Sequence, residues 1–205
     1  MGDDAARRSA LARGFAGWSQ PHDLFSKVMH KWDLYTCCSA QGVRGLFNAW
    51  TSAVTADGGE TRVNLLINHI SRHAVVRSWL PHDGRVEVTP ETSGDVLVRV
   101  PSWVDHRSFE ASVDGAVVGV SFLVPGFARV AGVAKGVTVA FRFPIAESTT
   151  IEPVLDVAYS ARWRGDTVVG LSPEGTRMPL YRRAAMQDRT VSMVHKSAAN
   201  VGFGL

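Results

Sequence analysis

The sequence has 205 residues, of which 45% are hydrophobic and 20% are charged, and it includes six Trp and nine Phe. This composition is that of a globular protein and excludes an intrinsically disordered chain. The net charge of +3 is small, and no run of Lys and Arg exceeds pairs such as Arg182-Arg183, so we expect no nucleic-acid partner. No stretch reaches transmembrane length and the first residues lack an apolar signal core. We therefore expect no membrane partner and a cytoplasmic chain, unless an upstream segment is missing.

A helix is predicted directly after the two cysteines, which are adjacent at Cys37 and Cys38. From Ser39, which can cap the helix, apolar residues recur at steps of three and four as far as Val54. Two glycines follow shortly afterwards and end the periodic stretch. The pattern therefore predicts a helix over Ser39–Ala56.

After Gly59 the hydrophobic period changes to two, which is typical of β-strands. Short strands separated by turn residues favour an antiparallel β-sandwich. The predicted strands are Arg62–Asn68, Ala74–Trp79, Arg85–Thr89, Asp95–Val100 and Val137–Phe143, followed by a hairpin of Ala158–Arg164 and Thr167–Leu171. The expected fold class is mainly β: an antiparallel β-sandwich preceded by a short α-helical segment. The expected domains are a helical segment over 1–58, a sandwich over 59–186 and a poorly ordered tail over 187–205.

The adjacent cysteines are the best candidates for chemistry. Adjacent cysteines rarely bridge each other, because the resulting ring is strained. A helix N-terminus favours the thiolate form, which is both a nucleophile and a soft metal ligand. A structural zinc site needs four ligands, and none of the seven histidines is tightly spaced relative to the pair. Spacing alone leaves two interpretations open, a zinc site and a pair of buried, inert cysteines.

Three other features of the sequence are weaker candidates for a site. His30 precedes the cysteines closely enough to line a pocket beside the thiolates, and it also fits an ordinary surface or core position. Trp18 could stack on a sugar ring. Asp83 and Glu87 could form an acid pair, but no motif supports them, and we expect them on the solvated surface.

The run Tyr35–Trp50 (YTCCSAQGVRGLFNAW) resembles the Cys-Cys block of glycoside hydrolase family 127, the β-L-arabinofuranosidase family. The resemblance extends from about Phe15 to Arg183, and the collinear order of the segments carries it. The other similar segments are Ala16–Trp18, Arg62–Asn68, Leu80–Pro81, Val98–Trp103, Tyr159–Pro173 and Pro179–Arg183.

This resemblance implies an (α/α)₆ helical barrel that holds the active site, followed by β-sandwich domains. It implies a retaining glycosidase that acts on a glycan or glycoside. By position, Cys37 would be the nucleophile and a zinc ligand, and Cys38 a second zinc ligand. The family's remaining ligands, a Glu and a third Cys, and its acid/base Glu lie further upstream.

This sequence departs from the family pattern, because its first glutamate is Glu60. The resemblance therefore implies a fragment that is inactive alone. Without a barrel, the apolar helix face with Val43, Phe47 and Trp50 would lack cover, so we expect self-association. The alternative is a stand-alone, non-catalytic β-sandwich module that binds a glycan or a partner subunit.

Overall fold

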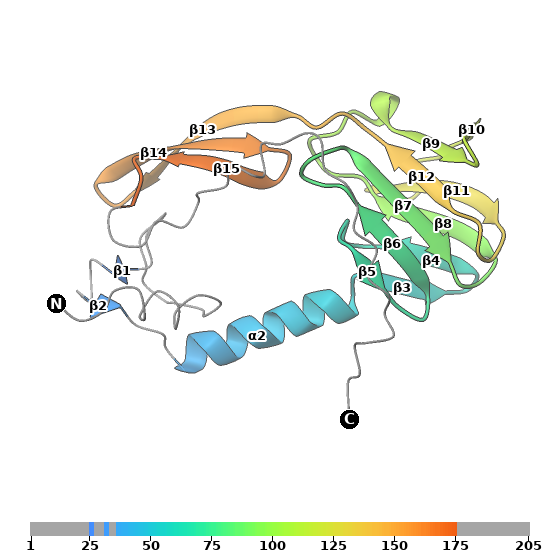
Figure 1. The fold of residues 1–205 in the computed structure, drawn as a ribbon, viewed down its shortest axis with the longest axis horizontal. Coiled ribbons are helices and arrows are strands. Elements are labelled where there is room, and N and C mark those ends of the chain that lie inside the picture. The colour runs from blue at the N-terminus through green and yellow to red at the C-terminus, as the bar shows by residue number, and fades with distance from the viewer. Residues whose placement is uncertain (1–24, 27–30, 33–35, 176–205) are drawn as a thin grey trace. The chain divides into compact units, whose positions relative to one another are not determined.

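The computed structural model describes residues 25–26, 31–32 and 36–175. Within these residues the fold is mainly β, with one α-helix, α2 (Thr36–Thr51), and one 3₁₀ helix, η1 (His106–Ser108), which confirms the predicted fold class. Neither of these helices is long and apolar enough to cross a bilayer. The chain divides into two compact units at Trp50 and Glu147 (Figure 1). The domain boundaries expected at residues 58 and 186 stay predictions, and the expected tail lies outside the described residues.

The unit that begins at Thr51 contains two β-sheets. The six-stranded sheet has the order β10-β9-β12-β7-β6-β5 and is antiparallel throughout. The four-stranded sheet has the order β11-β8-β4-β3, in which β4 and β8 are parallel. The strands are β3 (Val54–Asp57), β4 (Glu60–Val63), β5 (His69–Ile70), β6 (Ala74–Ser78), β7 (Arg85–Pro90), β8 (Gly94–Arg99), β9 (Glu110–Val113), β10 (Ala116–Val118), β11 (Phe127–Val133) and β12 (Val139–Arg142).

One hydrophobic core joins the inner faces of these two sheets. On β7, Val86 and Val88 are fully buried, whereas Arg85 and Glu87, which alternate with them, are only partly buried. This alternation is the period of two from which the strand was predicted. Aromatic residues extend the core at one end, where the Phe109 and Phe143 rings stack with their centroids 5.1 Å apart. The antiparallel sandwich expected from the sequence is thus present, apart from the parallel β4–β8 pair.

The predicted helix and first strand were both misplaced. The helix ends at Thr51, and Val54 begins strand β3 instead of continuing the apolar helix face. Gly58 and Gly59, with φ of 56° and 83°, form the two-residue turn between β3 and β4. Such a turn requires positive φ at both positions, which glycine adopts without steric cost. The first predicted strand accordingly lies earlier, because β4 ends at Val63 and does not reach Asn68.

The other compact unit carries a three-stranded antiparallel sheet, β13 (Glu147–Val154), β14 (Val157–Arg164) and β15 (Thr167–Ser172). The late hairpin predicted around Gly165 is confirmed as β14 and β15. A further short pair, β1 (Phe25–Ser26) and β2 (Lys31–Trp32), lies in the same unit. Strand β13 was not predicted, because Ser, Glu and Pro are poor strand formers.

Asp95 ties the four-stranded sheet together near an irregularity in β11. Its Oδ1 accepts a hydrogen bond from the backbone N–H of Gly132 at 2.9 Å, and its Oδ2 accepts one from Arg129 Nε at 2.7 Å. The pairing register of β11 with β8 shifts between Val130 and Val133, and Gly132 has a φ of 65°. The backbone hydrogen bond from Gly132, followed by that from Arg129, lowers the pKa of Asp95. The carboxylate therefore stabilises a bulged strand that lacks regular ladder hydrogen bonds there.

The burial of His69 predicts that the stability of the sandwich depends on pH. His69 lies buried on β5 with 5% of its surface exposed, and this burial lowers the pKa of its imidazole. The unfolded chain therefore binds more protons than the folded one below about pH 6.5. The contribution of neutral His69 to stability is therefore full above this pH and decreases as the pH falls from there towards the lowered pKa of the folded chain. We expect the free energy of unfolding to decrease between about pH 7 and pH 5.

Urea denaturation at several pH values measures this slope, and His69→Gln should reduce it. The same substitution at His73, which is less buried, is the control and should leave the slope nearly unchanged. Equal slopes in the wild-type and His69→Gln chains would show that the acid sensitivity arises elsewhere.

Candidate functional site

The structure places both cysteines inside the first turn of α2 and not before it. The helix begins at Thr36, so Cys37 and Cys38 are its second and third residues, and Ser39 is not its N-cap. Cys37 is exposed and Cys38 is partly buried, and neither forms a disulfide. The expected position of the pair at a helix N-terminus is confirmed. The helix begins about one turn earlier than predicted, so the cysteines lie within its first turn. The alternative of fully buried, inert cysteines does not fit this exposure.

The two thiols lie at a distance that suits one zinc ion. The Sγ atoms of Cys37 and Cys38 are 3.9 Å apart. Two thiolates on one tetrahedral zinc ion, each about 2.3 Å from the metal, lie about 3.8 Å from each other. The pair therefore has the spacing of two ligands of a single zinc ion.

The rest of a zinc site is not found in the part of the chain that the structure describes. No group of three or more His, Cys, Asp and Glu residues lies close enough together there to hold a metal ion. His30 and Trp18, the two predicted substrate-binding residues, lie outside the described residues. The described residues thus supply half of the four ligands that a structural zinc site needs.

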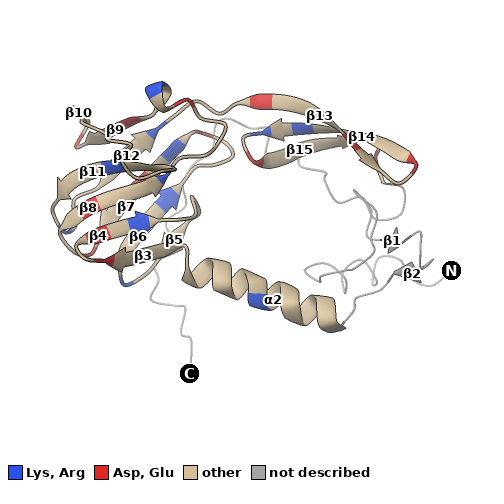
Figure 2. Cartoon of the chain, turned by 180° about the vertical axis from the view of Figure 1, so that it is seen from behind, with Lys and Arg blue, Asp and Glu red and all other residues tan. Residues whose placement is uncertain are grey.

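The helix that carries the cysteines exposes large apolar side chains. Val43, Leu46 and Phe47 are each more than 60% exposed, and Trp50 is 48% exposed. Arg44 is the single charged residue of α2 (Figure 2). A helix of this composition is typical of one that packs against other apolar elements.

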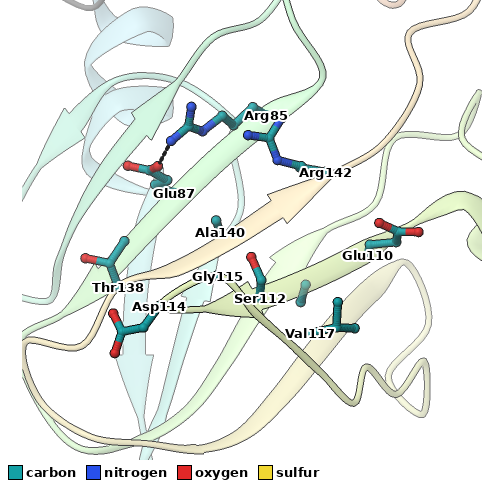
Figure 3. Close-up of a pocket in the computed structure, with 11 residues that line it drawn as sticks. Arg85, Glu87, Glu110, Ser112, Asp114, Gly115, Val117, Thr138, Ala140 and Arg142 are labelled. Atoms are coloured by element: carbon teal, nitrogen blue, oxygen red, sulfur yellow. Dashed lines mark hydrogen bonds and ion pairs between the residues drawn. The ribbon is translucent and has the colours of Figure 1, made fainter.

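A second candidate site lies on the outer face of the six-stranded sheet, where a hollow of about 500 Å³ opens (Figure 3). We call it the outer-face groove. Its floor consists of two small residues, Ala140 on β12 and Ser112 on β9, which are direct cross-strand partners. Longer side chains stand around this floor, and they are Arg85, Glu87, Glu110, Asp114, Val117 and Arg142. The groove exists because small residues meet at the centre of a face whose other residues are long.

The strand register determines which groups meet in the groove. Arg142 lies between Arg85 of β7 and Glu110 of β9, and Ala140 lies between Glu87 and Ser112. The Arg85 guanidinium pairs with the Glu87 carboxylate. It also stacks on the Trp79 ring, 4.3 Å from the ring centroid. Arg85 is therefore held in place from two sides.

The groove was not predicted from the sequence. Glu87 was expected only as a possible acid partner of Asp83, with both residues at the surface. The structure instead places Glu87 beside Arg85 and Arg77, at 3.9 Å from the latter. The sequence signal for the groove was the row of polar residues that alternates with buried valines along β7. Such alternation does not reveal which strands are neighbours in the sheet, so it could not show which residues meet.

No family model and no curated protein matches the chain. Solved structures do: a GH127 beta-L-arabinofuranosidase from Geobacillus stearothermophilus T6 matches with a TM-score of 0.50 and 21% identity, over 68% of this chain and 24% of the other. A structure described as a glycoside hydrolase gives a TM-score of 0.49 at 20% identity, over 65% of this chain and 25% of its own.

A GH127 beta-arabinofuranosidase gives a TM-score of 0.48 at 17% identity, over 64% of this chain and 25% of its own. At these identities the likeness concerns the fold alone. The chain spans about a quarter of the length of the structures that it matches. Over about two thirds of its length, this chain is therefore similar in fold to part of a GH127 beta-L-arabinofuranosidase.

Proposed function

We infer that this chain is part of a retaining glycoside hydrolase, with Cys37 as its nucleophile. The observation that carries this inference is the pair of accessible thiols in the first turn of α2, in a chain whose fold is similar to part of such an enzyme. Both the likeness in fold and the Cys-Cys run of the sequence support it. The matched region is about a quarter of that solved structure, so the activity is proposed for a larger protein and not for this chain alone.

The chemistry that follows is a double displacement. The Cys37 thiolate attacks the anomeric carbon of the glycoside, and the bond from that carbon to the leaving oxygen breaks. An acid group protonates the leaving oxygen, and water then cleaves the thioglycoside with the same group acting as base. The earliest glutamate of the sequence is Glu60, at the start of the sandwich. The residue that supplies the acid group is therefore left unassigned.

A zinc ion, when bound, would keep both thiols deprotonated at neutral pH. Cys37 and Cys38 would supply two of its ligands, as their 3.9 Å separation allows. Two ligands hold zinc less tightly than four, so the chain alone should bind it weakly. We expect substoichiometric zinc that a chelator removes with little change in folding, since the sandwich core is built without the pair.

One experiment tests this proposal with two readouts. The purified chain is titrated with Co²⁺, whose thiolate complexes absorb in the near ultraviolet, and is assayed against nitrophenyl arabinofuranosides. We expect weak thiolate-to-cobalt absorption that both Cys37→Ala and Cys38→Ala reduce. We expect no turnover from this chain alone.

Ser39→Ala, on the same helical turn, is the matched control and should leave the absorption unchanged. If the cysteine variants absorbed as strongly as the wild type, the pair would not be a metal site. Turnover that Cys37→Ala abolishes would keep Cys37 as nucleophile but would show that this chain is a minimal enzyme.

A further inference from the structure

The outer-face groove shares no residue with the thiol pair, and its chemistry can be considered separately. Its volume of about 500 Å³ lies within the range of about 300 to 1,000 Å³ that small-molecule sites have. This range fits a short chain of sugar rings better than a protein segment, which needs a larger surface.

The groove offers hydrogen-bonding groups that are not used within the described part of the chain. Among the described residues, Glu110, Ser112 and Asp114 make no side-chain hydrogen bond or ion pair. Arg142 has only a distant ion pair with Asp83, at 3.9 Å. The groove therefore presents the Arg142 guanidinium as a donor, the Glu110 and Asp114 carboxylates as acceptors and the Ser112 hydroxyl around one hollow. Sugar hydroxyl groups donate and accept at once, so this mixture suits them.

The charges of the groove disfavour an anion. Two guanidinium groups, of Arg85 and Arg142, face three carboxylates, of Glu87, Glu110 and Asp114. Arg85 and Glu87 already neutralise each other, which leaves Arg142 with two carboxylates. A phosphate or a sugar acid would meet this excess of negative charge, whereas an uncharged ligand would not.

The groove also has an apolar wall. Val117 on β10 is 80% exposed and lines the hollow from the side opposite β7 (Figure 3). The faces of sugar rings carry C–H groups that are stabilised against apolar side chains. Val117 therefore offers an apolar surface to a ligand in the groove, whereas an exposed valine on an ordinary edge strand faces only solvent.

From these observations we propose that the outer-face groove binds a short, uncharged oligosaccharide. Ala140 and Ser112 form the floor, Arg142, Glu110 and Asp114 bind the hydroxyl groups, and Val117 contacts a ring face. The choice of a saccharide rests in part on the proposed glycoside hydrolase function. The location and the charge preference rest on the groove itself.

The test measures binding of arabinotriose, xylotriose and cellotriose to the full chain by titration calorimetry. We expect at least one of them to bind. We expect Ala140→Tyr, which fills the floor, to weaken binding at least about tenfold. Arg142→Ala, on a half-exposed side chain, should weaken it by a similar factor without affecting the core. Because the ligand is uncharged, affinity should not change between low and high NaCl concentrations.

Ala131→Tyr is the matched control, because Ala131 is an exposed strand residue on the other sheet. It should leave the affinity unchanged, and circular dichroism verifies that every variant is folded. The absence of binding to all three sugars, or equal loss in both Tyr variants, would overturn the proposal.

Cys37→Ala separates this proposal from the proposed function. If the groove is the site, this variant binds the trisaccharide as the wild-type chain does, whatever the metal titration shows. If Cys37→Ala abolishes binding and Ala140→Tyr does not, the sugar binds near the thiols and the groove proposal is wrong.

Discussion

Replacing Phe141 with alanine is expected to lower the free energy of unfolding of the sandwich by about 3–5 kcal/mol. Phe141 is fully buried on β12, which lies between β7 and β9. Its ring contacts that of Phe109, with the centroids 5.8 Å apart. The substitution removes the apolar contacts of the whole ring and leaves a cavity that a two-sheet core fills only in part.

Guanidinium chloride denaturation followed by circular dichroism measures this loss. The matched control is Phe47→Ala, the same chemical change on α2, where the side chain is 64% exposed. We expect this control to change the stability of the sandwich by less than about 1 kcal/mol. Similar losses in both variants would contradict the placement of Phe141 at the centre of the core.

Gly94→Ala is expected to be similarly destabilising, by about 3 kcal/mol or more, although it adds a single methyl group. Gly94 has a φ of 154°, and a Cβ built on it lies 1.9 Å from the carbonyl oxygen of Gly59. That oxygen accepts a hydrogen bond from the Asp95 N–H at 2.9 Å. The neighbouring atoms are backbone, so relief requires the β3–β4 turn or the start of β8 to move.

Gly119→Ala is the control, because a Cβ there meets no atom within 4 Å. It should change stability by less than about 1 kcal/mol. Both glycine variants are measured by the same denaturation experiment. A Gly94→Ala chain as stable as the wild type would show that β8 and the β3–β4 turn lie further apart than described.

Sequence patterns located the strands whose side chains alternate clearly, and they missed those whose residues are small or polar. Strand β7 was predicted within one residue, because Val86 and Val88 alternate with charged neighbours. Strands β9 and β10, which pair with each other, were not predicted. Val54 was assigned to the helix because a spacing of four residues from Trp50 fits a helix face as well as a strand face. Gly58 and Gly59, which form the turn between β3 and β4, were the signal that Val54 belongs to a strand.

The two candidate sites differ in how far the sequence reveals them. The thiol pair is contiguous, so its position near a helix N-terminus could be predicted from local pattern alone. The outer-face groove combines residues from β7, β9 and β12, whose order in the sheet follows from pairing over more than twenty residues. Pairing partners at such separations leave no local signal, and Ala140 and Ser112 carry none by their residue type.

The short outermost strands of the six-stranded sheet influence how copies of this chain meet. Strand β10 has three residues and β5 has two, so each edge offers few backbone groups for pairing with another chain. Growth of that sheet into fibrils through its edges is therefore disfavoured. We expect concentrated solutions to form aggregates that mild detergent disperses, since their contacts would involve the apolar face of α2 and not an extended β-ladder.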